Sequence, residues 1–343
     1  MTLTSTLAEM LSNWLLVLAV LQASPPRGPR DTLRFYAVGD LNLGRVQTYR
    51  YLLQGDTLYP FAALADTLRA ADVLFGNLES PIAPLGAPFE PTGYYVFSAP
   101  PIAADALLRA GFDVVSNANN HAWDVGLPGI VHTLEQLDRV GLAHAGTGRT
   151  VEEAHRPAVV ERKGWRVAVF AVTRAFNPAP RTFYSHPGSH YIAYADSAWL
   201  YPAIRRLKAD SARRAADLIV VSVHAGQEFA DTADVALRRF MRGAVDAGAD
   251  IVLGHHPHVL QPLVWYKGKP IVSSLGNFVF ATGSPWTGLS AIFKFTIRPD
   301  GSITADLVPT RVGARATFAD SAAADSVRRR VGIPSPPSET AQP

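Results

Sequence analysis

The chain has 343 residues, of which 48% are hydrophobic and 18% charged, and this length and composition describe a globular protein of one large domain or two ordinary ones. Its formal net charge of +3, with no long Lys/Arg block, argues against nucleic acid as a partner. It contains no cysteine, which excludes disulfides, thiolate zinc sites and a cysteine nucleophile, so any metal must be bound by His, Asn, Asp or Glu.

The first predicted element is an apolar segment close to the N-terminus. Residues 10–24 (MLSNWLLVLAVLQAS) are apolar from Trp14 to Leu21, which is shorter than the about 20 residues that span a membrane. The length matches a signal-peptide core with Ala23 at a cleavage position, although no Lys or Arg precedes it. We expect residues 1–31 to be a signal peptide or N-terminal anchor plus linker, and the protein to be extracytoplasmic. A helix packed on the body is the alternative.

Apolar runs of strand length then recur along the chain. LRFYAV (33–38), DVLFG (72–76), FDVVS (112–116), DLIVVSV (217–223), DIVLG (250–254) and KPIVSSL (269–275) are such runs. Two hairpins are predicted, one over residues 158–172 and a closing one over residues 289–312. Residues 58–71, 129–141, 197–215 and 233–249 repeat apolar side chains at the three- and four-residue spacing of helices.

This alternation of buried strands with helices predicts an α/β protein. Continuous apolar strands require helices on both sides of a sheet, and the late hairpin adds antiparallel strands. We therefore expect residues 32–316 to form a four-layer α/β sandwich with two mixed sheets. Residues 317–343 are rich in Ala, Ser, Asp and Pro and are expected to be a low-complexity C-terminal tail, in which residues 332–343 are disordered.

Polar side chains that can bind metals follow the ends of several predicted strands. In open α/β sheets, binding sites form at the carboxyl ends of the strands, so these side chains are expected at one edge. They are Asp40, Asn77, Glu79, Asn120, His121, His224, His256 and His258.

The segment GHHPH, residues 254–258, is the most specific of these signals. On an extended segment, His256 and His258 point the same way and can contact one ion or two adjacent ions. Such donors suit Mn, Zn, Fe or Mg, and two ions about 3.5–4 Å apart can activate water and stabilise an oxyanion. Glu79 can bridge two ions. The full predicted ligand set is Asp40, Glu79, Asn120, His224, His256 and His258.

The stretch NANNHAWD, residues 117–124, places a ligand beside a proton donor. Asn120 is predicted to bind metal and His121 to act as general acid towards the leaving group. Asp124 is predicted to hold the tautomer and orientation of the His121 ring, as carboxylates behind catalytic histidines do.

Five further residues near these ligands are predicted to bind substrate. Arg45 can bind an anionic group through its planar fork, with a surface cation as the alternative. Glu228 can bind an amine or orient His224. The remaining three are Asn42, Asn77, which is also a candidate weak ligand, and Asn277. The long irregular stretch 174–190 is a candidate lid.

With these motifs in place, the chain resembles the CapA-type proteins of poly-γ-glutamate capsule synthesis, in the calcineurin-like metallophosphoesterase superfamily. The matching segments are AVGDLNLGR (37–45), GNLESPI (76–82), FDVVSNANNHAWDVG (112–126), VVSVHAGQEF (220–229), GADIVLGHHPHVLQP (248–262) and GKPIVSSLGNFVF (268–280). The resemblance implies a four-layer α/β fold with a dinuclear site. Asp40 then resembles the first-motif aspartate, Asn120-His121 the ligand and catalytic pair, and His256 with His258 the closing pair.

The chain departs from the superfamily pattern at two motifs. Asp40-Leu41-Asn42 stands where Asp-x-His is usual, and Gly76-Asn77 stands where Gly-Asp is usual, with the carboxylate displaced to Glu79. The doubled His255-His256 also leaves two candidates for one ligand.

The resemblance implies a role in making, exporting or trimming an anionic polymer at the cell surface, alongside membrane-bound capsule synthesis partners. If the protein is an enzyme, it is a metal-dependent hydrolase of a phosphoester or a poly-γ-glutamyl amide. The alternatives are a non-catalytic polymer-binding or assembly subunit on the same fold, and a general metal-dependent phosphoesterase.

Overall fold

The computed structural model describes residues 29–84, 96–177, 192–209, 215–281 and 285–333. The predicted signal or anchor core and most of the candidate lid lie outside these ranges. Within them, no helix is both long enough and apolar enough to cross a membrane.

The first sheet is mixed and has the order β14-β13-β12-β1-β2-β3-β4, with β11 pairing β1 from off this path. Strands β1 to β4 are parallel, whereas β12, β13 and β14 are antiparallel. Its strands are β1 (Leu33–Leu41), β2 (Val73–Leu78), β3 (Val114–Ser116), β4 (Ala143–Ala145), β11 (Asn277–Val279), β12 (Leu289–Ile297), β13 (Ile303–Arg311) and β14 (Thr317–Phe318).

The second sheet has the order β5-β6-β7-β8-β10-β9. Strands β6, β7, β8 and β10 are parallel, and the edge strands β5 and β9 are antiparallel to their neighbours. Its strands are β5 (Ala158–Arg162), β6 (Trp165–Thr173), β7 (Leu218–His224), β8 (Ile251–His255), β9 (Leu263–Tyr266) and β10 (Lys269–Val272).

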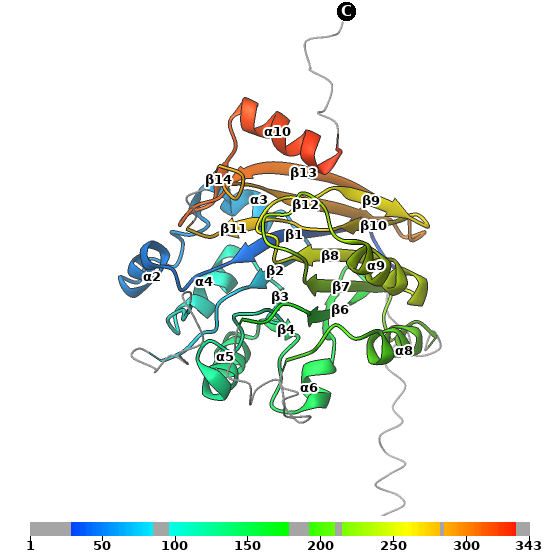
Figure 1. Cartoon of the computed structure of the whole chain (residues 1–343), viewed down its shortest axis with the longest axis horizontal. Helices are drawn as coiled ribbons and strands as arrows, with labels where there is room; N and C mark the ends of the chain where they lie inside the picture. The colour runs from blue at the N-terminus through cyan, green and yellow to red at the C-terminus, as the bar shows by residue number, and fades with distance from the viewer. Residues whose placement is uncertain (1–28, 85–95, 178–191, 210–214, 282–284, 334–343) are drawn as a thin grey trace, which may run out of the picture.

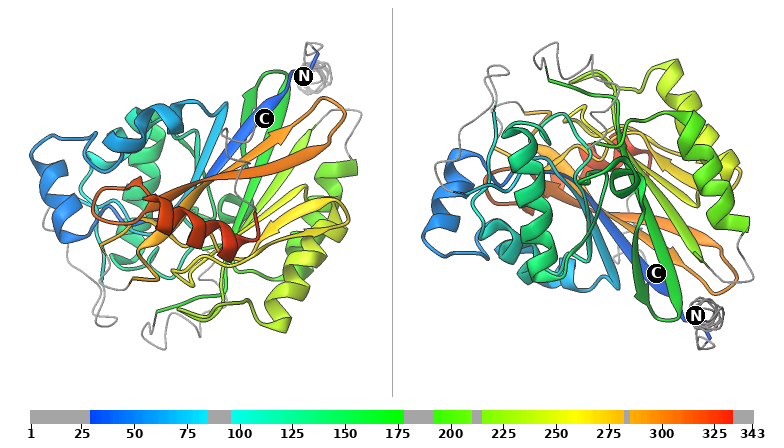
Figure 2. Two further views of the ribbon diagram at one scale, coloured as in Figure 1. Left: turned by 90° about the horizontal axis from the view of Figure 1, so that it is seen from above. Right: turned by 90° about the horizontal axis from the view of Figure 1, so that it is seen from below.

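Helices cover the outer face of each sheet, as Figure 2 shows. On the first sheet lie α2 (Val46–Leu53), η1 (Ala62–Leu64), α3 (Ala65–Arg69), α4 (Ala103–Ala110) and α5 (Gly126–Val140). On the second lie α8 (Ser197–Ala209) and α9 (Val235–Ala247). The short α6 (Val151–His155) precedes β5, and α10 (Ser321–Val331) packs on β13 and β12 (Figure 1).

The cores between these layers follow the two-residue alternation of the strands. Phe35 of β1 and Val220 of β7 lie in the central core between the sheets. Their neighbours Tyr36 and Val221 point the other way, into the cores beneath the helices. Because both faces of the central strands such as β1 and β7 are covered, these strands read as continuous apolar runs. The predicted four-layer α/β sandwich with two mixed sheets is confirmed.

The C-terminal boundary of the body was predicted wrongly. Strand β14 and helix α10 lie in the stretch expected to be a low-complexity tail, and the body continues through residue 331 at least. Asp320 caps α10 by accepting a hydrogen bond from the Ala323 amide at 2.9 Å, and Val327 and Val331 are fully buried in the central core. Ala323, Val327 and Val331 are spaced four residues apart, which is the spacing of one helix face.

The two sheets bring their carboxyl ends together at one place. Asp40 pairs in register with Asn77 on one side and Asn277 on the other, and His224 pairs with His255. Strand β1 lies close to the residue that precedes β11. This approach requires a glycine before Asp40, because a Cβ on Gly39 would stand 1.9 Å from the Gly276 carbonyl oxygen.

Candidate metal centre

Two fully buried carboxylates lie at the centre of this edge, Asp40 at the end of β1 and Glu79 directly after β2. Asp40 Oδ1 accepts hydrogen bonds from Asn77 Nδ2 at 2.9 Å and from His255 Nδ1 at 3.0 Å. Neither oxygen of Glu79 has a hydrogen-bond partner among the described residues. A buried carboxylate without partners is costly unless it is protonated or a cation neutralises it, so Glu79 is a candidate metal ligand.

Three histidines surround Glu79. His224, at the end of β7, places Nε2 3.7 Å from Glu79 Oε1, and His258 places its own Nε2 3.7 Å from the same oxygen. His258 Nδ1 lies 2.9 Å from Asn277 Oδ1, which fixes Nδ1 as the donor and leaves the Nε2 lone pair facing Glu79. The third ring, His256, lies 4.9 Å from that of His224 between centroids.

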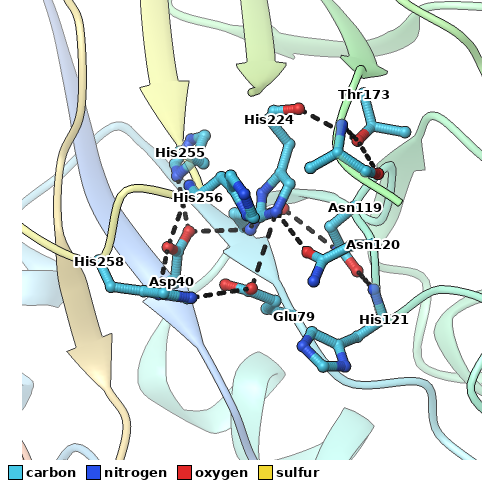
Figure 3. A network of polar contacts seen from close by, with 12 residues as sticks. Asp40, Glu79, Asn119, Asn120, His121, Thr173, His224, His255, His256 and His258 are labelled. Carbon is cyan, nitrogen blue, oxygen red and sulfur yellow. Dashed lines mark hydrogen bonds and ion pairs between the residues drawn. The ribbon is translucent and has the colours of Figure 1, made fainter. Parts of the chain in front are cut away.

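The backbone of this segment is strained. His256 and His258 have φ angles of 93° and 58°, in a region that non-glycine residues rarely adopt. Such strain costs about 1–3 kcal/mol per residue and concentrates at functional sites. Here it turns both imidazole rings towards Glu79, where Figure 3 shows them.

These side chains form two groups that could each hold a metal ion. Asp40, Glu79 and His224 make the first, Glu79, His256 and His258 make the second, and the ligand atoms within each lie within 4.8 Å of one another. Glu79 belongs to both, so two neighbouring ions would share it. The predicted ligand Asn120 points its Oδ1 at the first group, 2.7 Å from His224 Nε2. Oxygen and imidazole donors of this kind suit divalent metal ions.

The two carboxylates have opposite pKa shifts. Burial, and then the charge of Asp40, raises the pKa of Glu79 well above its ordinary range. Burial also opposes ionisation of Asp40, but hydrogen bonds from His255 and His258 outweigh it and hold the pKa of Asp40 well below its usual range. Asp40 is therefore kept ionised by neighbouring side chains, whereas ionisation of Glu79 requires a further positive charge beside it.

The histidines also differ in charge. Burial, then the charge of His258, lowers the pKa of His256 to about 4. Burial, then His256, holds the pKa of His224 well below its ordinary value. Burial acts in the same direction on His258, but Asp40 and Asn277 prevail and raise its pKa. His224 and His256 are thus neutral at pH 7, the form in which imidazole binds metals.

His121 and Asp124 have the relationship predicted for a proton donor and its positioning carboxylate. His121 Nδ1 lies 2.7 Å from Asp124 Oδ2, and both side chains are buried. Asp124 also accepts the Phe97 amide at 2.7 Å, and the Phe97 ring packs 4.1 Å from the His121 ring. The neighbouring Asn119 ties this loop to β2, because its Nδ2 donates to the Leu78 carbonyl at 2.8 Å.

Asn177 is a site residue that the motifs did not single out. Its Oδ1 accepts a hydrogen bond from Asn120 Nδ2 at 2.7 Å, and its Nδ2 donates to Asp124 Oδ1 at 3.4 Å. The first bond fixes the Asn120 amide so that Oδ1 points at His224. Its only signal in the sequence was its place in the long irregular stretch 174–190.

A cavity of about 350 Å³ opens beside these residues. Six predicted residues line it, together with the aromatic rings of Phe97, Phe229 and Phe280. The guanidinium carbon of Arg45 lies 5.5 Å from the Phe97 ring centroid and 5.8 Å from that of Phe280, within cation–π range. Glu228 is exposed. The six are Arg45, Asn120, His121, Glu228, His258 and Asn277.

Two predicted substrate-binding residues are not on the cavity wall. Asn42 is fully buried, and its Oδ1 accepts the Gly44 amide at 3.1 Å to form a tight turn. Asn77 is still part of β2, so its side chain stays between Asp40 and His224, with Nδ2 3.2 Å from His224 Nδ1. Asn77 thus supports the ligands Asp40 and His224 from beneath. His255 does the same, because its Nδ1 bonds to Asp40 and it belongs to neither metal group.

Comparison with known proteins gave one matching family and several relatives. The family described as "Bacterial capsule synthesis protein PGA_cap" matches residues 34–282. The capsule biosynthesis protein CapA of Bacillus anthracis is 32% identical over 289 residues, covering 82% of this chain and 68% of that protein. The PGA biosynthesis protein CapA of Bacillus subtilis (strain 168) is 30% identical over 281 residues, covering 81% and 71%.

Two solved structures are also similar, each at 12% sequence identity. The sulfate thiohydrolase SoxB of Thermus thermophilus has a TM-score of 0.44, with 90% of this chain and 61% of that chain covered. This chain therefore spans less than two thirds of SoxB. The TT1561 protein of the same species has a TM-score of 0.39, with 81% and 99% covered.

Proposed function

The chain belongs to the bacterial capsule synthesis protein family PGA_cap, and on that premise we propose that it is a metal-dependent hydrolase of an anionic capsule or envelope polymer, poly-γ-glutamate in the first place. The observation that carries the proposal is Glu79, a fully buried carboxylate without a hydrogen-bond partner in the described chain, shared by two groups of metal-binding side chains.

Two divalent ions, of Mn, Zn, Fe or Mg, fit the donors that surround Glu79. Asp40, His224 and Asn120 would hold one ion, His256 and His258 the other, and Glu79 both. When bound, such ions supply Lewis-acid chemistry, activating water and polarising the bond to be cleaved.

The protein's own groups supply proton transfer and binding. His121 gives a proton to the leaving group, and Asp124 keeps the other ring nitrogen, Nδ1, protonated and fixed in direction. Arg45 attracts a carboxylate or phosphate of the substrate at the cavity wall, while Phe97 and Phe280 exclude water around it. The bond cleaved is a γ-glutamyl amide or a phosphoester.

The proposal includes a place of action outside the cytoplasm. The apolar segment within residues 1–31 would export or anchor the protein, and membrane-bound capsule synthesis partners would deliver the polymer. Fractionation of cells that express the full chain tests this step, and recovery in the cytoplasm alone would contradict it.

A second function, a non-catalytic polymer-binding or assembly subunit, has one observation in its favour. Asn42 stands where the superfamily pattern has a histidine ligand, and its side-chain oxygen is already bonded to the Gly44 amide. The first ion would therefore have fewer protein ligands than the superfamily pattern provides.

One experiment separates the two functions. The full-length chain is depleted of metal, reloaded with Mn or Zn, and assayed for bound metal and for cleavage of poly-γ-glutamate and of a phosphodiester. The hydrolase is expected to bind metal, to keep it but lose turnover in His121→Ala, and to lose metal in His256→Ala. The matched control is His132→Ala, a histidine on α5 outside the site. If the wild type binds no metal and His256→Ala leaves polymer binding unchanged, the protein is the assembly subunit instead.

A further inference from the structure

A second, basic groove lies on the outer face of the second sheet, over α8 and α9. Its volume is about 670 Å³, larger than the cavity beside the metal centre. Figure 2 shows these two helices together at one side of the molecule. Twelve residues line the groove, and four of them are arginines, Arg174, Arg238, Arg239 and Arg242.

These four arginines differ from other arginines of the protein. None of the four forms an ion pair with an acidic side chain in the described part of the chain, whereas several exposed arginines elsewhere do. Among the paired ones are Arg34 with Asp72, Arg139 with Asp105 and Arg162 with Asp113. The acid that lines the groove, Asp246, is already bonded to Lys267 Nζ at 2.5 Å and to the Tyr266 hydroxyl at 3.3 Å.

Two of the arginines on α9 also repel each other. Arg238 and Arg242 are four residues apart on the same helix face, and like charges at this spacing repel. Arg239 adds a third charge to the same groove wall. A cluster that costs local stability and lacks acidic partners indicates an anionic ligand.

The groove is built from fixed groups. The Arg174 guanidinium lies 4.7 Å from the Phe240 ring centroid, while its Nε donates to the Ala195 carbonyl at 2.9 Å. The Tyr201 hydroxyl donates to the Phe240 carbonyl at 2.8 Å. This helix contact depends on Gly243, where a Cβ would stand 2.4 Å from the Tyr201 hydroxyl oxygen.

The groove adjoins the metal centre through one short segment. The Arg174 amide donates to the His224 carbonyl at 2.9 Å, so the groove begins beside a predicted metal ligand. Asn177, which lines the cavity, lies three residues further along, a separation of at most about 10 Å between Cα atoms. The groove and the cavity therefore adjoin the same short segment of the chain, from Arg174 to Asn177.

We propose that this groove binds consecutive carboxylates of a polyanionic chain while the bond to be cleaved lies in the cavity. The inference rests on the proposed function, since it assigns a binding site to the polymer substrate of that centre. The cavity beside the metal centre is too small to hold a polymer. The guanidinium groups of the groove can hold the rest of the chain, because each can pair with a carboxylate through two parallel hydrogen bonds. The protein thus recognises a polycarboxylate over a length that extends well beyond the reacting unit.

Polymer binding by charge-matched variants tests the groove. The full-length chain, treated with chelator to prevent cleavage, is titrated against fluorescein-labelled poly-γ-glutamate and followed by anisotropy. The groove variant is Arg239→Gln with Arg242→Gln, and the control is Arg206→Gln with Arg298→Gln, which removes the same charge outside the groove. We expect Kd to rise about tenfold or more in the groove variant and to stay within about twofold in the control. Unlabelled poly-γ-glutamate is expected to displace the labelled polymer more effectively than polyphosphate does.

Three outcomes would overturn the proposal for the groove. They are equal weakening of polymer binding in both variants, no weakening in either, or displacement of the labelled polymer by polyphosphate as effectively as by unlabelled poly-γ-glutamate. The last would reveal a site for phosphate polyanions. Failure of the hydrolase gives a different result. If the groove variant binds polymer weakly but the metal-loaded wild type cleaves nothing, only the hydrolase proposal is refuted. If cleavage depends on His121 but the groove variant binds polymer normally, only the groove proposal is refuted.

Discussion

Glu79→Gln is the substitution that isolates the role assigned to the shared carboxylate. It replaces a buried acid with an uncharged amide of almost the same shape. In the metal-depleted protein the carboxyl of Glu79 has no hydrogen-bond partner among the described residues, and burial, then the charge of Asp40, raises its pKa well above the ordinary value of 4.5. Without metal, therefore, the native acid should destabilise the fold.

The size of this effect follows from proton linkage. Above pH 4.5 the unfolded chain ionises Glu79 while the folded chain keeps it protonated, so stability falls as pH rises, by about 1.4 kcal/mol per pH unit until the folded-state pKa is reached. Between pH 4.5 and pH 7 the loss grows to at most about 3 to 4 kcal/mol. Because glutamine does not titrate, Glu79→Gln should raise the free energy of unfolding by up to about 3 to 4 kcal/mol at pH 7 and by less than about 1 kcal/mol at pH 5.

Urea denaturation of the full-length wild type and variant, after chelator treatment, measures this difference at both pH values. The same titrations are then repeated with Mn or Zn. Metal at about 100 times its Kd should stabilise the wild type by about 2.7 kcal/mol per site, and the variant much less, because the ligand common to both groups has lost its charge.

The matched control is Glu135→Gln, an exposed acid on α5, whose effect on stability should stay within about 0.5 kcal/mol. The reasoning fails if Glu79→Gln is less stable than wild type in the metal-depleted state at pH 7. It also fails if metal stabilises wild type and variant equally.

Three further substitutions test the surroundings of the site and the fold. Asp124→Asn should lower turnover about 100-fold or more with bound metal unchanged, because the carboxylate positions His121; equal loss of metal would contradict this. Asn177→Ala should weaken metal binding about 10- to 100-fold in a calorimetric titration, since it releases the Asn120 amide. Unchanged affinity would show that the Asn120 amide is held by other contacts. Val327→Ala should lower the free energy of unfolding by about 2 kcal/mol in urea, whereas a disordered tail would give no change.

The layer architecture was predictable because burial of both strand faces leaves a clear record in the sequence. Strands β6 and β7 are continuous apolar runs, and α9 repeats apolar residues on one face beneath them. Short strands such as β11 and β14 lack enough residues to show any period. Helix α10 was hidden because alanine, serine and arginine dominate it and only its buried face carries valines.

The ligands were predictable because each follows a strand end, and strand ends of one sheet meet at one edge. The direction of each side chain was not. The pairing of β1 with β2 is irregular between Ala37 and Asp40, so simple alternation cannot say where Asn42 points. Asn177 reaches Asn120 and Asp124 only through the tertiary fold, and local sequence carries no record of such a contact.

The central claim is that Glu79 is shared by two metal ions, and anomalous diffraction from crystals of the Mn- or Zn-loaded protein tests it most directly. We predict two anomalous peaks that both contact Glu79, one also contacting Asp40 and His224 and the other His256 and His258. A map with no peak at this edge of the sheets, or with a single peak that leaves Glu79 uncontacted, would contradict the claim.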